Sequence, residues 1–152
     1  MTSDSSSQTL STRKRRSLTK TLETLAENAR ERELHLRDKG TKVSDATTAS
    51  DRRSLQGFDG RARGYQACRF AYEDVLRRLD AVERAPAEVG EDDADVARYC
   101  TQCSADGFDA AARTDDLERA HYLTGLSEAY RDAASRINSA LGIDHTASEG
   151  AS

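Results

Sequence analysis

The sequence predicts an all-α protein: a three- to four-helix bundle with disordered N- and C-terminal tails and a long polar linker after the first helix. Three observations lead to this prediction. Ala, Leu, Arg and Glu are abundant, and these residue types favour helix. The chain has 3 Phe, 5 Tyr, 1 Pro and no Trp, which is poor in the aromatic and turn-forming residues of a β-sandwich. Apolar residues also recur at heptad spacing in two long segments.

The N-terminal part of the chain, as far as Gln56, is expected to form an arm, a helix and a linker. Residues 1–16 are rich in Ser and Thr and end in four consecutive basic residues, so we expect a disordered basic arm. A helix is expected over 17–38, with an apolar stripe that weakens at Arg32. The stripe consists of Leu18, Leu22, Leu25 and Ala29. Residues 39–56 are polar and are expected to be a linker.

Residues 57–142 are expected to form the helical bundle, with helices at about 60–85, 92–112 and 115–142. In the first and last of these helices, the apolar positions are spaced alternately by three and four residues, which is a heptad pattern. These positions are Tyr65, Cys68, Tyr72, Val75, Leu79 and Val82, followed by Leu123, Leu126, Tyr130, Ala133, Ile137 and Ala140. Residues 143–152 are expected to be a disordered tail.

The helices at 60–85 and 115–142 match when Arg61 is aligned with Arg119, and their heptad positions superpose in the same alignment. Six identical pairs result, and one hypothesis is an internal duplication. The alternative is chance, because two helices rich in Ala, Arg and Asp will share some identities. The pairs are Arg61/Arg119, Ala62/Ala120, Ala71/Ala129, Tyr72/Tyr130, Asp74/Asp132 and Arg78/Arg136.

The three cysteines are expected to be small buried hydrophobic residues, as free cysteine often is. Cys68 occupies a heptad position, and Cys100 and Cys103 share the apolar face of the helix at 92–112 with Val96. We therefore expect no metal and no cofactor. The alternative is a zinc site that combines the three cysteines with a histidine from the last helix. Its residues would be Cys68, Cys100, Cys103 and His121.

Thiol chemistry at Cys100 and Cys103 is a further alternative. In the all-helical alkylhydroperoxidase D-like family, a glutamate precedes a C-x-x-C pair and a histidine follows it by four residues. Glu88 stands twelve residues before Cys100 and fits this pattern, but the position of the histidine is Gly107. Without this histidine the proton relay to the thiol is missing. We therefore expect a protein that is not an enzyme.

Charge is divided unequally along the chain. Residues 1–70 hold 15 basic and 9 acidic side chains, whereas residues 71–152 hold 8 and 18. A basic N-terminal half predicts contact with a polyanion such as nucleic acid, through phosphates rather than bases. The predicted contact residues are Arg13, Lys14, Arg15, Arg16, Lys20, Arg30, Arg52, Arg53, Arg61 and Arg63.

The hypothesis for function is a non-enzymatic helical interaction or assembly protein, an accessory protein of a virus or plasmid, with a basic arm that contacts nucleic acid non-specifically. A homo-oligomer or a protein partner is expected. The alternative is an assembly protein that binds an acidic protein partner without nucleic acid. The polar N-terminus and the lack of a long apolar run predict no secretory signal and no membrane span, and hence a cytoplasmic or virion-associated protein.

Overall fold

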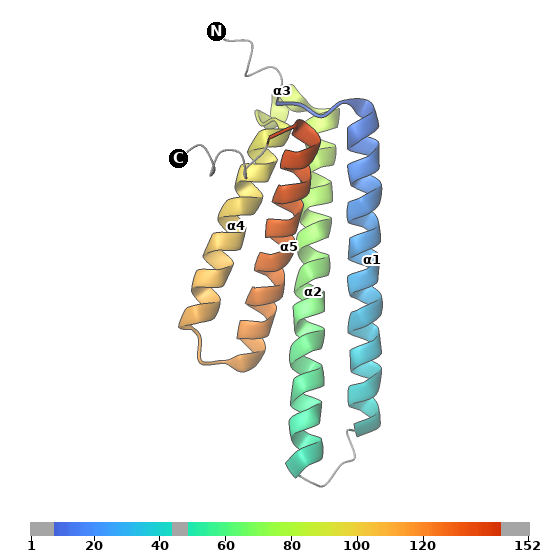
Figure 1. Cartoon of the computed structure of the whole chain (residues 1–152), viewed down its shortest axis with the longest axis vertical. Helices are drawn as coiled ribbons and strands as arrows, with labels where there is room; N and C mark the ends of the chain where they lie inside the picture. The colour runs from blue at the N-terminus through green and yellow to red at the C-terminus, as the bar shows by residue number, and fades with distance from the viewer. Residues whose placement is uncertain (1–7, 44–48, 144–152) are drawn as a thin grey trace.

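The computed structural model describes residues 8–43 and 49–143. Within them all of the regular structure is helical, which confirms the predicted all-α class. Four long helices run alternately down and up the molecule, and a one-turn helix joins the second to the third (Figure 1). The helices are α1 (Thr12–Val43), α2 (Ala49–Arg84), α3 (Pro86–Val89), α4 (Asp93–Arg113) and α5 (Leu117–Leu141). No helix within the described ranges is long and apolar enough to cross a bilayer.

The central pair of the bundle is α2 and α5, which lie side by side and run in the same direction (Figure 1). Helix α1 packs mainly on α2, and α4 packs mainly on α5. The molecule therefore consists of two antiparallel hairpins, α1–α2 and α4–α5, joined along their second helices. The α1–α2 hairpin is the longer one and extends beyond the lower end of its neighbour (Figure 1).

The core lies between these four helices and is built mostly from small and medium-sized apolar residues, together with Tyr72 and Tyr130. Helix α2 contributes Val75 and Leu79, α5 contributes Ala133 and Ile137, and every one of these side chains is fully buried or almost so. Of the twelve heptad positions predicted in α2 and α5, all except Tyr65 and Leu123 belong to this core or pack against it.

The predicted disordered arm is wrong for the residues that the structure describes. Helix α1 begins at Thr12, so Arg13, Lys14, Arg15 and Arg16 are helical. The physical reason is Arg15, whose side chain is buried by contacts with α2 and α4 and fixes the first turn. Residues 1–7 lie outside the described residues.

The predicted linker at 39–56 is also wrong, because α1 continues to Val43 and α2 begins at Ala49. Gly40 is buried inside α1, where a Cβ would lie 3.3 Å from Cδ1 of Leu55. The apolar stripe of α1 is interrupted near Arg32, because the next buried position is the charged Glu33, and it resumes at Leu36. Residues 44–48 of the predicted linker lie outside the described residues.

The remaining helix boundaries agree closely with the prediction. Asp92 caps α4 and forms a capping box with Asp95, as expected for an acidic N-terminus. The N-cap of α5 is Asp116, whose side chain accepts a hydrogen bond from the Arg119 backbone N–H. Gly142 ends α5 in a left-handed conformation with φ of 80°. Of the predicted C-terminal tail, residues 144–152 lie outside the described residues.

Candidate functional site

Arg15, one of the predicted contact residues, is part of the structural core. Its Nη1 donates a hydrogen bond of 3.1 Å to the Leu79 carbonyl, and its Nε lies 2.9 Å from a Glu83 carboxylate oxygen. Its Nη2 pairs with Oδ2 of Asp93, whose side chain is fully buried. The same Asp93 oxygen accepts a hydrogen bond of 2.7 Å from the Leu10 backbone N–H. Arg15 therefore joins α1, α2 and α4, and is not free to contact a ligand.

The other basic residues at the start of α1 remain exposed. We define the α1 basic cluster as the four exposed cations on the first three turns of α1: Arg13, Lys14, Arg16 and Lys20. Over the described ranges, none of these four forms an ion pair with an acidic side chain. The N-terminal end of a helix also carries a partial positive charge. The cluster therefore combines four exposed cations with the positive end of a helix dipole that is held in place by Arg15.

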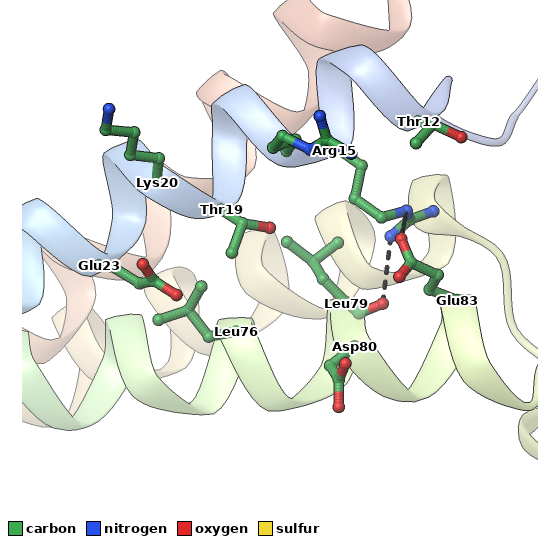
Figure 2. A pocket seen from close by; sticks show the side chains of 10 residues that line it. Thr12, Arg15, Thr19, Lys20, Glu23, Leu76, Leu79, Asp80 and Glu83 are labelled. Atoms are coloured by element: carbon green, nitrogen blue, oxygen red, sulfur yellow. Dashed lines mark hydrogen bonds and ion pairs between the residues drawn. The ribbon is translucent and has the colours of Figure 1, made fainter.

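A cleft of about 550 Å³ lies beside the cluster, between α1 and α2 (Figure 2). Its floor is formed by Leu76 and Leu79 of α2. Lys20 and Arg16 lie on the α1 side, whereas Asp80 and Glu83 lie on the α2 side. Because Glu23 of α1 and the two acidic residues of α2 also line it, the cleft itself does not favour a polyanion.

The second half of the predicted contact residues lies far from this cluster. Arg52, Arg53, Arg61 and Arg63 belong to the first half of α2, at the opposite end of the bundle (Figure 1). Arg63 pairs with Glu118 at 2.9 Å, and Arg61 lies over the Phe58 ring at 5.6 Å. Arg30 pairs with Glu27 along α1 at 3.6 Å. The structure therefore does not join the ten predicted residues into one surface.

A polar network that the sequence did not reveal as a unit surrounds Asp74 of α2. Its Oδ2 accepts hydrogen bonds from the hydroxyls of Tyr130 at 2.7 Å and Tyr99 at 3.1 Å. Arg78 lies within 3.4 Å of the same oxygen and stacks on the Tyr99 ring, 3.5 Å from its centroid. Burial by itself would raise the pKa of Asp74, but the two tyrosines and Arg78 outweigh it and hold this pKa below its ordinary value.

A second, similar network surrounds Asp132 of α5. Its Oδ2 accepts a hydrogen bond of 2.8 Å from the Tyr72 hydroxyl and one of 2.9 Å from Arg136. Each tyrosine thus reaches the aspartate of the other helix, since Tyr130 of α5 donates to Asp74 of α2. Reciprocal bonds of this kind relate α2 and α5 by an approximate two-fold axis parallel to them. These two networks contain three of the six identical pairs found in the sequence.

Two of the three cysteines are held as thiols in the packed interior. Cys100 is fully buried, and burial raises the pKa of its thiol to about 12. Cys68 donates a hydrogen bond of 3.3 Å to the Gly125 carbonyl, and burial raises its pKa to about 11. Across the described ranges no three His, Cys, Asp or Glu side chains are grouped so that they could hold a metal ion. The alternative of a zinc site at Cys68, Cys100, Cys103 and His121 is therefore not supported.

Gly60 and Gly64 of α2 lie against His121 and Gly125 of α5 where the two helices meet. A Cβ at Gly60 would lie 2.7 Å from the His121 ring, and one at Gly64 would lie 3.3 Å from the His121 carbonyl oxygen. A Cβ at Gly125 would overlap the Gly64 backbone. The glycines allow the two helices to approach each other, and they do not form a loop that could hold a phosphate.

Comparison with known proteins gives no relative for this fold and these sites: no family model matches the chain, and no curated protein or solved structure shows significant similarity to it.

Proposed function

We propose that this protein is a non-enzymatic helical interaction protein that binds the phosphate backbone of nucleic acid through the α1 basic cluster. The observation that carries the proposal is the exposure of Arg13, Lys14, Arg16 and Lys20 on one short stretch of a fixed helix, without intramolecular ion pairs in the part of the chain that the structure describes. Each cation that meets a phosphate releases condensed counterions, and this makes the affinity dependent on salt.

The supporting geometry differs from that of a flexible arm. Arg15 fixes the first turn of α1, so the four cations project from a rigid surface and lose less conformational entropy on binding than a disordered segment would. The cluster covers roughly 10 Å along the helix axis, a length that matches a few phosphates. No base-stacking aromatic side chain belongs to it, so binding without sequence preference is expected.

The experiment is a mobility-shift titration of full-length protein with double-stranded DNA at several salt concentrations. One variant replaces the cluster (Arg13→Gln, Lys14→Gln, Arg16→Gln, Lys20→Gln). A matched control removes the same charge at the opposite end of the bundle (Arg53→Gln, Arg61→Gln, Arg113→Gln, Arg119→Gln). We expect the logarithm of the binding constant to fall linearly with that of the salt concentration, and the cluster variant to lose about one unit of slope per cation that contacts phosphate. Salt-independent binding, or equal losses in both variants, would contradict the proposal.

A second candidate function is binding to an acidic protein segment. The favouring observation is that exposed Glu23 and Glu27 follow the cluster along α1, which shortens the basic surface. A short acidic peptide needs less length than a nucleic acid does. Competition between DNA and poly-glutamate for the full-length protein separates the two, since the tighter competitor identifies the class of partner.

Self-association is part of the same proposal. Large apolar side chains are exposed on three helices, and Leu34, Phe70 and Leu117 are 55%, 49% and 66% accessible. Static light scattering across a salt series tests whether copies associate and whether charge takes part. An oligomer whose mass is unchanged by salt would assign the contact to these apolar residues and not to the charge division.

A further inference from the structure

The two polar networks are similar but not equally complete. The Asp74 carboxylate interacts with the side chains of Tyr130, Arg78 and Tyr99. Among the described residues, the Asp132 carboxylate interacts only with Tyr72 and Arg136. The missing partner is the counterpart of Tyr99. As a result the Asp74 side chain is 13% exposed and the Asp132 side chain is 37% exposed.

The counterpart of Tyr99 can be identified because α1 packs on α2 as α4 packs on α5. When Arg15 is aligned with Asp93, five buried positions of α1 coincide with buried positions of α4. The coinciding pairs are Arg15/Asp93, Leu18/Val96, Leu22/Cys100, Ala26/Ser104 and Ala29/Gly107. In this alignment the residue equivalent to Tyr99 is Thr21.

A groove occupies the space that an aromatic ring at position 21 would fill. It lies between α1 and α5 and has a volume of about 530 Å³. Thr21 and Leu18 line one side, and Asp132 and Arg136 line the other. Lys14 of the α1 basic cluster stands at its edge. Arg136 and Asp132 are thus the equivalents of Arg78 and Asp74, which hold Tyr99 in the other half of the molecule. Among the residues that line the groove, no aromatic ring lies between these two side chains and α1.

We propose that this groove binds a tyrosine side chain presented by an acidic segment of a protein partner. The ring stacks on the Arg136 guanidinium and its hydroxyl donates to Asp132, as Tyr99 does with Arg78 and Asp74. An acidic segment is favoured because Lys14 and Arg136 outnumber Asp132 among the charged residues that line the groove. The inference depends on the groove alone and does not require that the protein bind nucleic acid.

The experiment measures binding of three synthetic glutamate-rich peptides that differ at one central residue, which is Tyr, Phe or Ala. Full-length protein is titrated with each peptide, labelled for fluorescence anisotropy. We expect the Tyr peptide to bind about tenfold more tightly than the Ala peptide, with the Phe peptide between them, because Phe retains the stacking and loses the hydrogen bond.

Two variants locate the site. Thr21→Tyr places the equivalent of Tyr99 in the groove and should abolish the preference for the Tyr peptide while the helix content stays the same. Arg136→Gln removes the stacking cation and should reduce the preference without filling the groove. Thr24→Tyr is the matched control: it adds the same ring at an exposed position of α1 that does not line the groove, and should leave the preference intact.

Three results would overturn the inference. One is equal affinity for the Tyr and Ala peptides. Another is a Thr21→Tyr variant that folds and still discriminates like the unmodified protein. The third is tighter binding of a free purine nucleotide than of the Tyr peptide, lost in the Thr21→Tyr variant, which would assign the groove to a nucleobase.

Discussion

Arg15 and Asp93 occupy equivalent positions in the two hairpins and form a buried ion pair with each other. The pair brings together three helices, because Arg15 also contacts the Leu79 carbonyl and Glu83. Breaking a buried pair leaves an uncompensated charge, which costs far more than the loss of an exposed pair.

The first prediction concerns this pair. Arg15→Met should lower the free energy of unfolding by about 3–5 kcal/mol, because the Asp93 carboxylate stays buried without its partner. Urea unfolding followed by circular dichroism measures the change. Arg16→Met, at an exposed neighbouring position, should change it by about 0.5 kcal/mol or less. The double variant Arg15→Met/Asp93→Leu should recover part of the loss; equal shifts for Arg15→Met and Arg16→Met would contradict the role of Arg15.

Stability should decrease at acidic pH through Asp74. Hydrogen bonds from Tyr130 and Tyr99 and the charge of Arg78 hold its pKa in the folded protein below the ordinary value, despite burial. The unfolded chain therefore binds a proton at higher pH than the folded chain does. This contribution to stability is present above about pH 4 and is lost as pH falls through the lower pKa of the folded state.

Urea midpoints measured from neutral pH down to about pH 3 test this dependence. Asp74→Asn should be less stable near neutral pH, and its urea midpoint should fall less steeply at acidic pH than that of the unmodified protein. Asp109→Asn, at an exposed position of α4, serves as the control and should keep the full acid dependence. If the urea midpoint of Asp74→Asn falls with acid as steeply as that of the unmodified protein, other carboxylates cause the loss of stability at acidic pH.

The thiols of Cys68 and Cys100 should react slowly in the folded protein. Burial raises their pKa values to about 11 and about 12, so little thiolate is present near neutral pH, and Cys100 is also inaccessible. Alkylation with iodoacetamide, followed by mass spectrometry of peptides, measures each site. Both cysteines should become reactive in denaturant, and rapid native labelling of Cys100 would show that α4 opens from α5.

Close contact of α2 and α5 should make Gly125 intolerant of a side chain. Gly125→Ala should lower the free energy of unfolding by about 1–3 kcal/mol, because the added Cβ would overlap the Gly64 backbone. Gly57→Ala is the matched control: it lies in α2 with open space around it, and should raise stability by about 0.5–1 kcal/mol. Thermal unfolding compares the two, and a tolerated Gly125→Ala would mean that the helices can separate at this level.

The sequence predicted most of the central pair of helices. The heptad positions from Tyr65 to Val82 and from Leu123 to Ala140 specify apolar stripes at helical spacing, and such stripes are recognisable without tertiary information. The tyrosines and aspartates of the two networks also appeared as identical pairs in one alignment. The sequence did not predict that each tyrosine donates to the aspartate of the other helix, because this arrangement depends on α2 and α5 running in the same direction.

Prediction failed at both ends of α1 for a related reason. Arg15 and Glu33 are charged, so a pattern of apolar residues excludes them from the core. Both are buried in the structure because their partners come from other turns or helices: Asp93 and Glu83 for Arg15, Arg37 and Arg69 for Glu33. A charged residue can occupy a core position when a partner neutralises it, and a partner on another helix, such as Asp93 or Arg69, cannot be recognised from the local sequence.

The equivalence of the two hairpins creates a risk of mispairing between molecules. A hairpin that accepts its near-copy within one chain also presents a surface on which the same hairpin of another chain could pack. Arg15 and Asp93 oppose this outcome. Two α1–α2 hairpins packed together would place Arg15 against Arg15, and two α4–α5 hairpins would place Asp93 against Asp93, so each like pair would bury two charges of one sign. Only unlike hairpins bring the opposite charges together, and this single pair therefore selects the correct partner for each half of the molecule.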